Sequence, residues 1–311
     1  MKIVVALGGN ALLKRGEPMT EAVQRSNIRK AALSLVTLIH ASHRLIITHG
    51  NGPQVGLIAL QADAGPEDGQ YPLDVLGAES QGMIGYLIEQ ELRNLLPRDA
   101  LVASVLTQVV VSSADEAFLH PSKPIGPVYG EGEARSLMAS KGWTCALDGK
   151  KWRRVVASPD PLEILQLASI ATLVDHGVTV ICAGGGGVPV TRSAAGKLEG
   201  VEAVIDKDFT SQLLAQHLDV DMLLLLTDVD AVYVNYGSAN SAAISRMGPD
   251  PESANSFDAG SMGPKVEAAT RFAMATGRNA GIGRIEDAAA IVVGNAGTIV
   301  QARDIGTEYR I

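Results

Sequence analysis

Residues 3–10 read "IVVALGGN", and this stretch decides the class of fold. Five apolar residues, three of them β-branched, are typical of a buried β-strand, and the two glycines that follow predict a tight turn. The pattern recurs in "LIITHGNG" at residues 45–52 and in "TVICAGGGG" at residues 179–187. Repeated strands that run directly into glycine predict a sheet whose strand ends gather at a common edge.

Helical patterns lie between these strands. Residues 20–40 carry apolar side chains at helical spacing, and residues 73–97 predict a long helix that stops at Pro97. Residues 100–111, "ALVASVLTQVVV", predict one strand or two. Further on, helices are predicted near 162–175, from about 209 and over 262–275, and strands at 178–183, 222–227 and 231–235. This alternation predicts an α/β fold with a largely parallel central sheet.

Residues 112–158 break the alternation. They contain several prolines and glycines and the charged run "DGKKWRR", which predicts an excursion from the main sheet, either a lid or a small protruding subdomain. We expect two lobes that meet near residue 183. The N-terminal lobe then covers residues 1–183 and the C-terminal lobe residues 184–311.

Composition narrows the possible functions. Of 311 residues, 46% are hydrophobic and 19% are charged, which is typical of a globular chain. The net charge of −8 argues against a nucleic-acid or anionic-membrane surface, so a bound anion must meet a few local cations and backbone amides.

Compartment signals are few. The N-terminal apolar run is too short for a signal sequence, and no stretch approaches the roughly 18 apolar residues of a membrane span. Cys145 and Cys182 have neither metal-site spacing nor the pattern of a disulfide framework, which fits a reducing compartment. The sequence therefore predicts a soluble cytoplasmic protein.

The glycine-rich strand ends are candidate anion sites. Glycine lets backbone N–H groups approach an anion closely, and a following helix N-terminus adds partial positive charge. One such turn has a purely steric explanation, but three in one chain favour an oxyanion or phosphate crevice. The candidates are Gly8, Gly9 and Asn10, then Gly50, Asn51 and Gly52, then Gly184–Gly187.

Common nucleotide and metal motifs are absent from the sequence. There is no G-x-x-x-x-G-K-[ST] for a P-loop and no G-x-G-x-x-G for a dinucleotide. H-E-x-x-H and C-x-x-C are also absent, so we expect no metal held by protein side chains. His49, at a strand end, is a candidate base, although a structural role is commoner for such a histidine.

Three lysines have unusual neighbours: Lys123 in "PSKPIGP", Lys207 in "VIDKD" and Lys265 in "GSMGPKV". Most lysines are solvated surface residues. Lys265, however, is predicted in the first turn of a helix, where a cation opposes the helix dipole unless an anion lies in front of it. Lys207 stands between two aspartates, which indicates either a solvated turn or a cation held in place to bind an anion.

Together these motifs resemble the carbamate kinases of the amino acid kinase superfamily. The matching runs extend over essentially the whole chain: "ALGGNALL", "THGNGPQVG", "PLDVLGAESQGMIGY", "PSKPIGP", "CAGGGGVPV", "GVEAVIDKDFTS", "LLLTDVDAVYVNYG" and "GSMGPKVEAA". The resemblance implies a three-layer αβα sandwich, with carbamoyl phosphate or carbamate on the N-terminal lobe and ADP or ATP on the C-terminal lobe. It also implies Mg²⁺ held mainly by the nucleotide phosphates, a homodimer and a role in arginine metabolism.

The resemblance also assigns residues to roles. Lys123, Lys207 and Lys265 would neutralise the transferred phosphoryl group, and Asp208 would hold the ammoniums in place, with Asp206 a weaker candidate for that task. The substrate side would comprise Gly8, Gly9, Asn10, Gly50, Asn51 and Gly52. The nucleotide side would comprise Gly184, Gly185, Thr227, Asp228, Tyr233, Met262 and Lys265.

One departure helps to choose within the superfamily. Related kinases carry a lysine at the first-strand position that is Ala6 here, whereas carbamate kinases bring a lysine from the protruding subdomain. Lys123 matches that lysine, and Ser122 replaces the usual threonine before it. The leading hypothesis is a carbamate kinase. The alternatives are another small-acceptor acyl-phosphate kinase and a catalytically silent sensor of nucleotide or metabolite.

Overall fold

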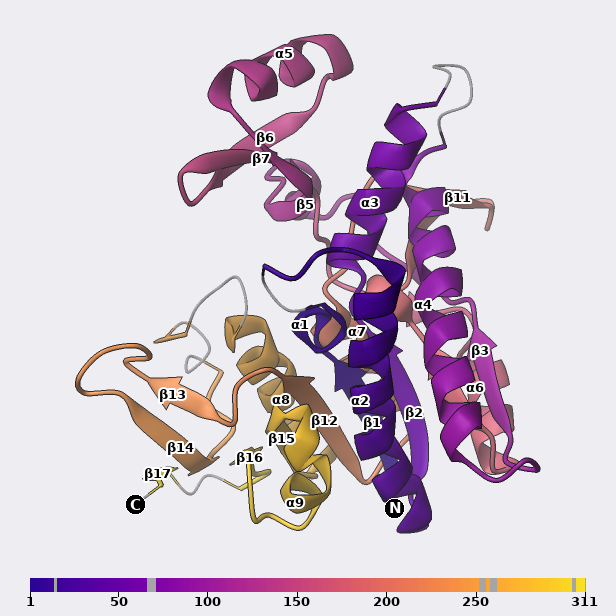
Figure 1. Cartoon of the computed structure of the whole chain (residues 1–311), viewed down its shortest axis with the longest axis vertical. Coiled ribbons are helices and arrows are strands. Elements are labelled where there is room, and N and C mark those ends of the chain that lie inside the picture. Colours follow the sequence, from indigo (N-terminus) through magenta and orange to yellow (C-terminus); the bar gives the residue numbers. More distant parts are fainter. Residues whose placement is uncertain (14–15, 66–70, 252–255, 258–261, 304–305, 311) are drawn as a thin grey trace.

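A ten-stranded sheet forms the centre of the molecule in the computed structural model, which describes residues 1–13, 16–65, 71–251, 256–257, 262–303 and 306–310 (Figure 1). In spatial order its strands are β13 (Val232–Val234), β14 (Ala242–Met247), β16 (Thr298–Val300), β15 (Ala280–Arg284), β12 (Met222–Thr227), β1 (Lys2–Leu7), β2 (Arg44–His49), β9 (Thr179–Cys182) and β3 (Val102–Val105). The tenth strand, β17 (Thr307–Tyr309), pairs with β14.

The middle of this sheet is parallel. β1 pairs in parallel with β12 on one side and β2 on the other, so that Ala6 lies between Leu225 and Thr48. The parallel run continues through β15 and through β9 to β3, and antiparallel pairs occur at the β13–β14, β14–β17 and β15–β16 contacts. The predicted largely parallel sheet is confirmed, and the carboxyl ends of β1, β2 and β12 meet at one edge.

Helices cover both faces of the sheet. Because successive side chains of a strand point to opposite faces, Ile3, Val5 and Leu7 of β1 join one core while Val4 and Ala6 join the other. The first core packs against α2 (Glu21–His40), α4 (Leu73–Leu95) and α9 (Ala288–Val292). The second packs against α6 (Leu167–Asp175), α7 (Lys207–His217) and α8 (Met262–Thr276). The predicted αβα sandwich is confirmed.

Local signals set most element boundaries. α2 begins after Thr20, whose hydroxyl accepts a hydrogen bond from the Val23 N–H, and α4 ends two residues before Pro97. Residues 100–111 form two strands, since β3 belongs to the central sheet and β4 (Gln108–Val110) to a second sheet. That second sheet has the order β11 (Leu198–Gly200), β10 (Val188–Arg192), β4 and β8 (Glu163–Ile164).

Short helices complete the main body: α1 (Gly9–Leu12), α3 (Gly52–Asp63) and the 3₁₀ turns η2 (Glu116–Phe118), η3 (Gly184–Gly186) and η5 (Ile285–Asp287). Two predicted helix starts need correction. The helix expected near residue 162 begins at Leu167 because β8 uses the preceding residues, and the helix expected from about residue 209 begins at Lys207.

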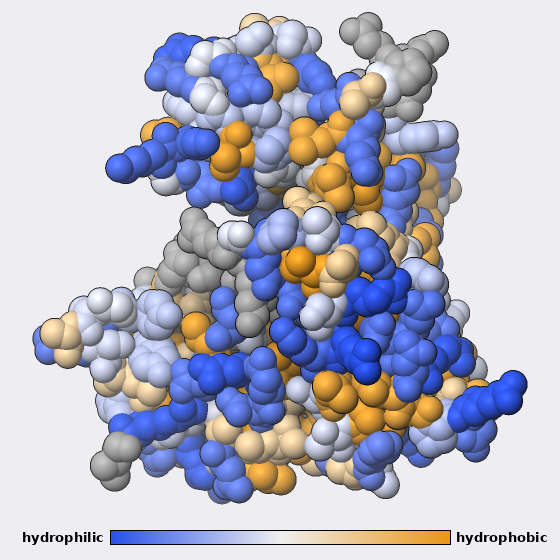
Figure 2. Space-filling model, in the orientation of Figure 1, coloured by the Kyte–Doolittle hydropathy of each residue, from blue (hydrophilic) through white to orange (hydrophobic). Residues whose placement is uncertain are grey.

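The excursion predicted over residues 112–158 contains a small protruding subdomain, residues 123–156, that stands off the main body in Figures 1 and 2. Its sheet has the order β5 (Lys123–Tyr129), β7 (Lys151–Val156), β6 (Thr144–Asp148), and α5 (Glu131–Lys141) connects β5 to β6. Tyr129, Ala134 and Cys145 form its own small core. The subdomain therefore folds on a separate set of contacts.

Two glycines join the subdomain to the main body. α3 packs against β5, and a Cβ added to Gly56 of α3 would lie 2.8 Å from the Gly126 Cα. Gly126 has a φ of +69° and sits where the register of β5 shifts against β7, a conformation that favours glycine. Val55 and Ile125 pack beside this contact, which sets the position of the base of β5.

The central sheet is continuous across residue 183, since β1 and β12, which lie on either side of that position in the chain, are neighbours.

Over the residues that the structure describes, none of the helices combines the length and apolarity needed to cross a bilayer.

We predict that Gly56→Ala loosens the attachment of the subdomain. The added methyl group has no room against backbone, so the free energy of unfolding should fall by about 1–3 kcal/mol. Chemical denaturation measures this. Gly82→Ala is the matched control, because Gly82 lies in α4 with nothing within 4 Å of an added Cβ and should be neutral or stabilising. Equal stability of the two variants would contradict the contact.

Candidate active site

The predicted lysines converge on one cavity of about 260 Å³ at the carboxyl edge of the central sheet. Lys123 comes from β5, Lys207 from the start of α7 and Lys265 from the start of α8. Residues from distant segments of the chain therefore meet at one place. Besides the lysines, the residues that line the cavity and were candidates from the sequence are Gly9, Gly50, Asn51, Gly52, Gly185, Asp206 and Asp208. Other lining residues include Pro53, Val204 and Pro264.

Asp208 bridges two of the lysines. Lys207 Nζ donates to Asp208 Oδ1 at 2.5 Å, and Lys265 Nζ donates to Asp208 Oδ2 at 3.1 Å. The Asp208 side chain is 4% exposed and the two lysine side chains 11% and 10%. A single buried carboxylate thus holds two ammoniums at the floor of the cavity.

Burial and mutual charge set the protonation of this cluster. Burial alone would raise the pKa of the Asp208 carboxyl, but the two ammoniums hold that pKa well below its usual range. Burial would lower the pKa of Lys265, yet Asp208 keeps that pKa above its ordinary value. For Lys207 burial outweighs Asp208, and the nearby Lys265 charge adds to it, so the pKa of Lys207 is lowered. Asp208 is therefore ionised at neutral pH.

The third lysine meets a second aspartate. Lys123 Nζ donates to Asp206 Oδ2 at 2.5 Å. The other oxygen of Asp206 accepts the Asp208 N–H at 2.9 Å and so caps the N-terminus of α7. From the sequence Asp206 was only a weaker candidate, since nothing in a linear sequence links it to a lysine 83 positions away.

Glycines form the wall beside the lysines because the chain approaches itself closely there. A Cβ on Gly50 would lie 3.1 Å from the Gly9 N and 3.5 Å from the Lys207 Cδ. Gly185, with φ +64°, abuts the Asn51 side chain, whose amide donates to Ser80 at 2.7 Å. Any larger residue at these positions would enter the cavity or push its walls apart.

Other predicted glycines pack against protein and do not line this cavity. The Gly8 N–H donates to the Leu226 carbonyl at 2.8 Å, which joins the ends of β1 and β12. Gly184 packs against the His49 ring, where an added Cβ would lie 2.4 Å from Cε1. Asn10 lies in α1, and its side chain is outside the described part of the structure.

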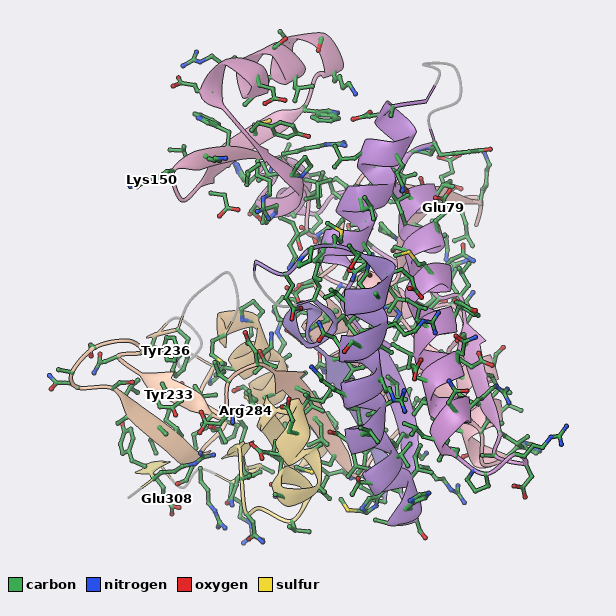
Figure 3. All side chains as sticks on the ribbon, in the orientation of Figure 1. Glu79, Lys150, Tyr233, Tyr236, Arg284 and Glu308 are labelled. Atoms are coloured by element: carbon green, nitrogen blue, oxygen red, sulfur yellow. The ribbon has the colours of Figure 1, made fainter. Side chains whose placement is uncertain are left out.

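The predicted nucleotide residues lie further along the same edge. Thr227 ends β12 and donates to the Asp228 carboxylate at 3.0 Å, and its Cα lies 3.6 Å from a Cβ placed on Gly8. Tyr233 of β13 donates to Asp230 at 2.9 Å, and Figure 3 shows it near Tyr236. Met262 begins α8, three residues before Lys265. Of this set Gly185 and Lys265 line the cavity that holds the three lysines.

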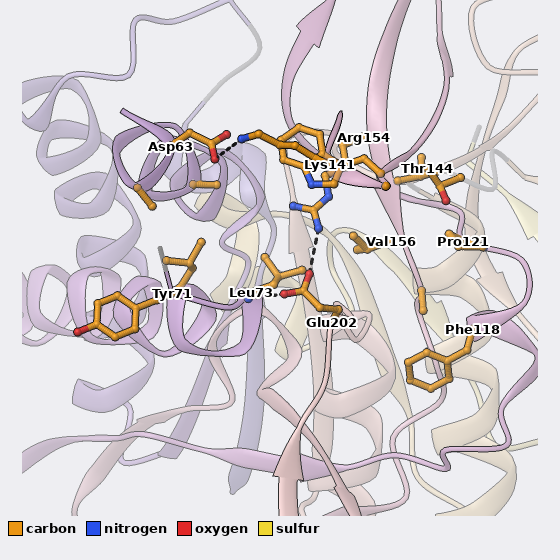
Figure 4. A pocket seen from close by; sticks show the side chains of 17 residues that line it. Asp63, Tyr71, Leu73, Phe118, Pro121, Lys141, Thr144, Arg154, Val156 and Glu202 are labelled. Atoms are coloured by element: carbon orange, nitrogen blue, oxygen red, sulfur yellow. Dashed lines mark hydrogen bonds and ion pairs between the residues drawn. The ribbon is translucent and has the colours of Figure 1, made fainter. Parts of the chain in front are cut away.

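A larger cavity, about 710 Å³, lies elsewhere, between the protruding subdomain and the main body (Figure 4). Two ion pairs cross it, Arg154 to Glu202 at 2.9 Å and Lys141 to Asp63 at 2.6 Å. It contains none of the three convergent lysines, so the smaller cavity is the candidate active site. Within the described residues, no three His, Cys, Asp or Glu side chains come together as a metal-binding group.

Comparison with known proteins agrees with this geometry. Residues 1–283 match the model of the amino acid kinase family. The chain belongs to the amino acid kinase family. It is 53% identical to a carbamate kinase of Rhizobium meliloti, over 97% of this chain and 94% of the relative. It is 51% identical to a carbamate kinase of Haemophilus influenzae, over 99% of each. The resemblance seen in the sequence motifs is confirmed.

Solved structures extend the comparison. Carbamate kinase from Giardia lamblia bound to AMP-PNP superposes with a TM-score of 0.88 at 39% identity, over 96% of this chain and 98% of that one. UMP kinase from Bacillus anthracis, at 12% identity and a TM-score of 0.57, shares the fold alone. Together, the family and its kinase members confirm the predicted phosphotransferase.

His49 gives a pH-dependent prediction. Burial, partly offset by the Gly50 carbonyl on Nδ1, lowers the pKa of His49 to about 4. The unfolded chain therefore binds a proton that the folded chain does not, and stability is lost as the pH falls below the unfolded value of about 6.5. Between pH 7 and 5 the wild type should lose about 2 kcal/mol more than His49→Gln in urea unfolding.

The control for this experiment is His120→Gln, which replaces an exposed histidine and should retain the wild-type dependence on pH. Parallel pH profiles for the wild type and His49→Gln would show that His49 does not carry the effect.

Proposed function

We propose that this protein is a carbamate kinase, which transfers a phosphoryl group reversibly between carbamoyl phosphate and ADP and yields ATP and carbamate. The observation that carries the proposal is the convergence of three lysine ammoniums on one small cavity, two of them bridged by Asp208. Relatives about half identical over nearly the whole chain are named carbamate kinases.

Phosphoryl transfer needs positioned reactants and compensation for negative charge more than covalent help from the protein. Lys207 and Lys265 are held by Asp208 before substrate arrives, so little reorganisation remains when charge develops on the transferred group. Both ammoniums lie in a cavity with little exposure, where a charge acts more strongly than in water.

The two substrates approach from the two lobes in this proposal. Gly8, Gly9, Asn10, Gly50, Asn51 and Gly52 serve carbamoyl phosphate or carbamate on the N-terminal lobe, residues 1–183. Gly184, Gly185, Thr227, Asp228, Tyr233 and Met262 serve the nucleotide on the C-terminal lobe, residues 184–311, with Lys265 at the boundary. Support comes from the shared edge: β1 and β2 end beside the first group, and β12 ends at Thr227 of the second.

Mg²⁺ enters as part of the nucleotide substrate. Asp208 is occupied by two ammoniums, which leaves the nucleotide phosphates as the main ligands of the metal. A homodimer in the cytoplasm and a role in arginine metabolism complete the proposal and rest on the resemblance to the family.

The alternatives make different products. Another small-acceptor kinase of the same family would use the same lysines, and the small cavity admits other small acyl phosphates. A silent sensor would bind nucleotide without turnover, but the intact lysine and aspartate cluster speaks against it.

The test is a coupled assay for ATP formed from ADP, Mg²⁺ and carbamoyl phosphate, with acetyl phosphate as the comparison donor. We expect ATP with carbamoyl phosphate and much less with acetyl phosphate. ATP with acetyl phosphate alone would refute the carbamate assignment, and nucleotide binding without ATP from either donor would favour a sensor.

We further predict that Lys207→Ala and Lys265→Ala each lower kcat by about 10²–10³, the effect of removing one preorganised charge donor. The unfolding temperature of each variant should stay close to that of the wild type. Lys150→Ala is the control, since Lys150 lies at the tip of the β6–β7 hairpin (Figure 3) and should leave kcat unchanged. Near-normal turnover of either site variant would mean that this lysine does not act on the phosphoryl group.

A further inference from the structure

We infer that Asp206 is a positioning residue that holds the Lys123 ammonium of the protruding subdomain at the phosphate cavity of the main body. The inference rests on the proposed function and deepens it. Asp206 lines the cavity, its side chain is 12% exposed, and its Oδ2 accepts from Lys123 Nζ at 2.5 Å.

The two oxygens of Asp206 serve different elements. Oδ1 accepts the Asp208 N–H at 2.9 Å and caps α7, the helix whose first two residues are Lys207 and Asp208. Oδ2 holds Lys123, the first residue of β5. One carboxylate thus links the helix that carries the Lys207–Asp208 pair to the strand that carries the third cation. The position of Lys123 relative to the other two ammoniums depends on this link.

Other contacts place the subdomain without placing the lysine. The ion pairs Arg154–Glu202 and Lys141–Asp63 bridge the subdomain to the main body around the larger cavity (Figure 4). None of these four side chains lines the phosphate cavity. Lys123 itself is 34% exposed, so its long flexible side chain has room to leave the cavity when nothing holds its ammonium.

The negative charge of Asp206 allows two possible roles of this residue to be distinguished. Three ammoniums and two carboxylates surround the cavity, so Asp206 reduces the positive charge offered to an anionic substrate. If Asp206 acted through charge alone, its neutralisation would strengthen the binding of carbamoyl phosphate. If it positions Lys123, neutralisation weakens binding although the cavity becomes more positive. The two explanations predict opposite signs.

The first experiment is Asp206→Asn in the full-length protein. Asparagine has the same shape and is an equally good N-cap, so α7 keeps its cap while Lys123 loses its ionic partner. We expect KM for carbamoyl phosphate to rise about tenfold, the scale of one hydrogen bond to a charged group, with KM for ADP within twofold. An unchanged or lowered KM for carbamoyl phosphate would overturn the inference.

A double-mutant cycle separates positioning from a general effect on α7. In the Lys123→Ala background there is no ammonium to position, so adding Asp206→Asn should not raise KM for carbamoyl phosphate further. Equal increases in both backgrounds would place the effect of Asp206 elsewhere and refute the inference.

Two further variants complete the design. Asp206→Ser keeps a good N-cap but is too short to reach Lys123, and it should reproduce the increase in KM if Asp206→Asn folds poorly. Glu202→Gln weakens a different link to the subdomain and should leave KM near the wild-type value. A matching increase in Glu202→Gln would show that attachment of the subdomain, and not the position of Lys123, is what matters.

The wild-type assay distinguishes the two levels of the argument. If the wild type forms no ATP from carbamoyl phosphate, the proposed function fails. If it does and the Asp206 variants behave as wild type, this inference alone fails.

Discussion

The candidate site depends on one buried carboxylate. Asp208 accepts one ammonium on each oxygen, from lysines at the starts of two helices that lie side by side on the same face of the sheet. Without it, Lys207 and Lys265 would be two buried like charges at the positive ends of α7 and α8. The free energy lost when these charges are removed from water offsets much of their mutual attraction. Stabilising the fold is therefore a poor explanation for the cluster. In the proposed function the cluster is a preorganised receptor for a phosphoryl group.

The parallel sheet makes that receptor possible. Strands β1, β2 and β12 end at one edge, and β1 and β2 run there into glycines that pack closely, since a Cβ added to Gly50 would lie 3.1 Å from the Gly9 N. The helices that follow begin at the same edge and point their N-terminal amides toward it. A protein of net charge −8 thereby creates a local positive site without a basic surface.

The third cation arrives by a different route. Ala6 occupies the first-strand position that holds a lysine in related kinases, and β1 is so tightly packed that Ala6 is fully buried between two strands. Lys123 supplies the charge from a subdomain that has its own core and meets the main body at the Gly56–Gly126 contact. A cation on such an element has a position that depends on tertiary contacts, which gives the Asp206 carboxylate its proposed importance.

Many elements of the fold were predictable because they depend on local sequence patterns. The apolar runs of β1, β2, β9 and β12 and the stop of α4 before Pro97 follow from residue spacing and turn chemistry. Short sequence motifs identified the family and the three candidate lysines. The two boundary errors have different causes: at β8 a short strand takes residues that were expected in a helix, and at α7 the Asp206 cap starts the helix earlier than expected.

Only the tertiary structure decided which distant residues contact one another. Hydrophobic periodicity records which face of an element is buried, but not which charged side chain, 83 residues away, will lie against it. The sequence by itself determined the αβα fold and the candidate lysines, since both depend on local pattern. The pairing of Lys123 with Asp206, the packing of Gly184 on His49 and the separation of Tyr233 from the phosphate cavity arose only when the sheet brought distant segments together.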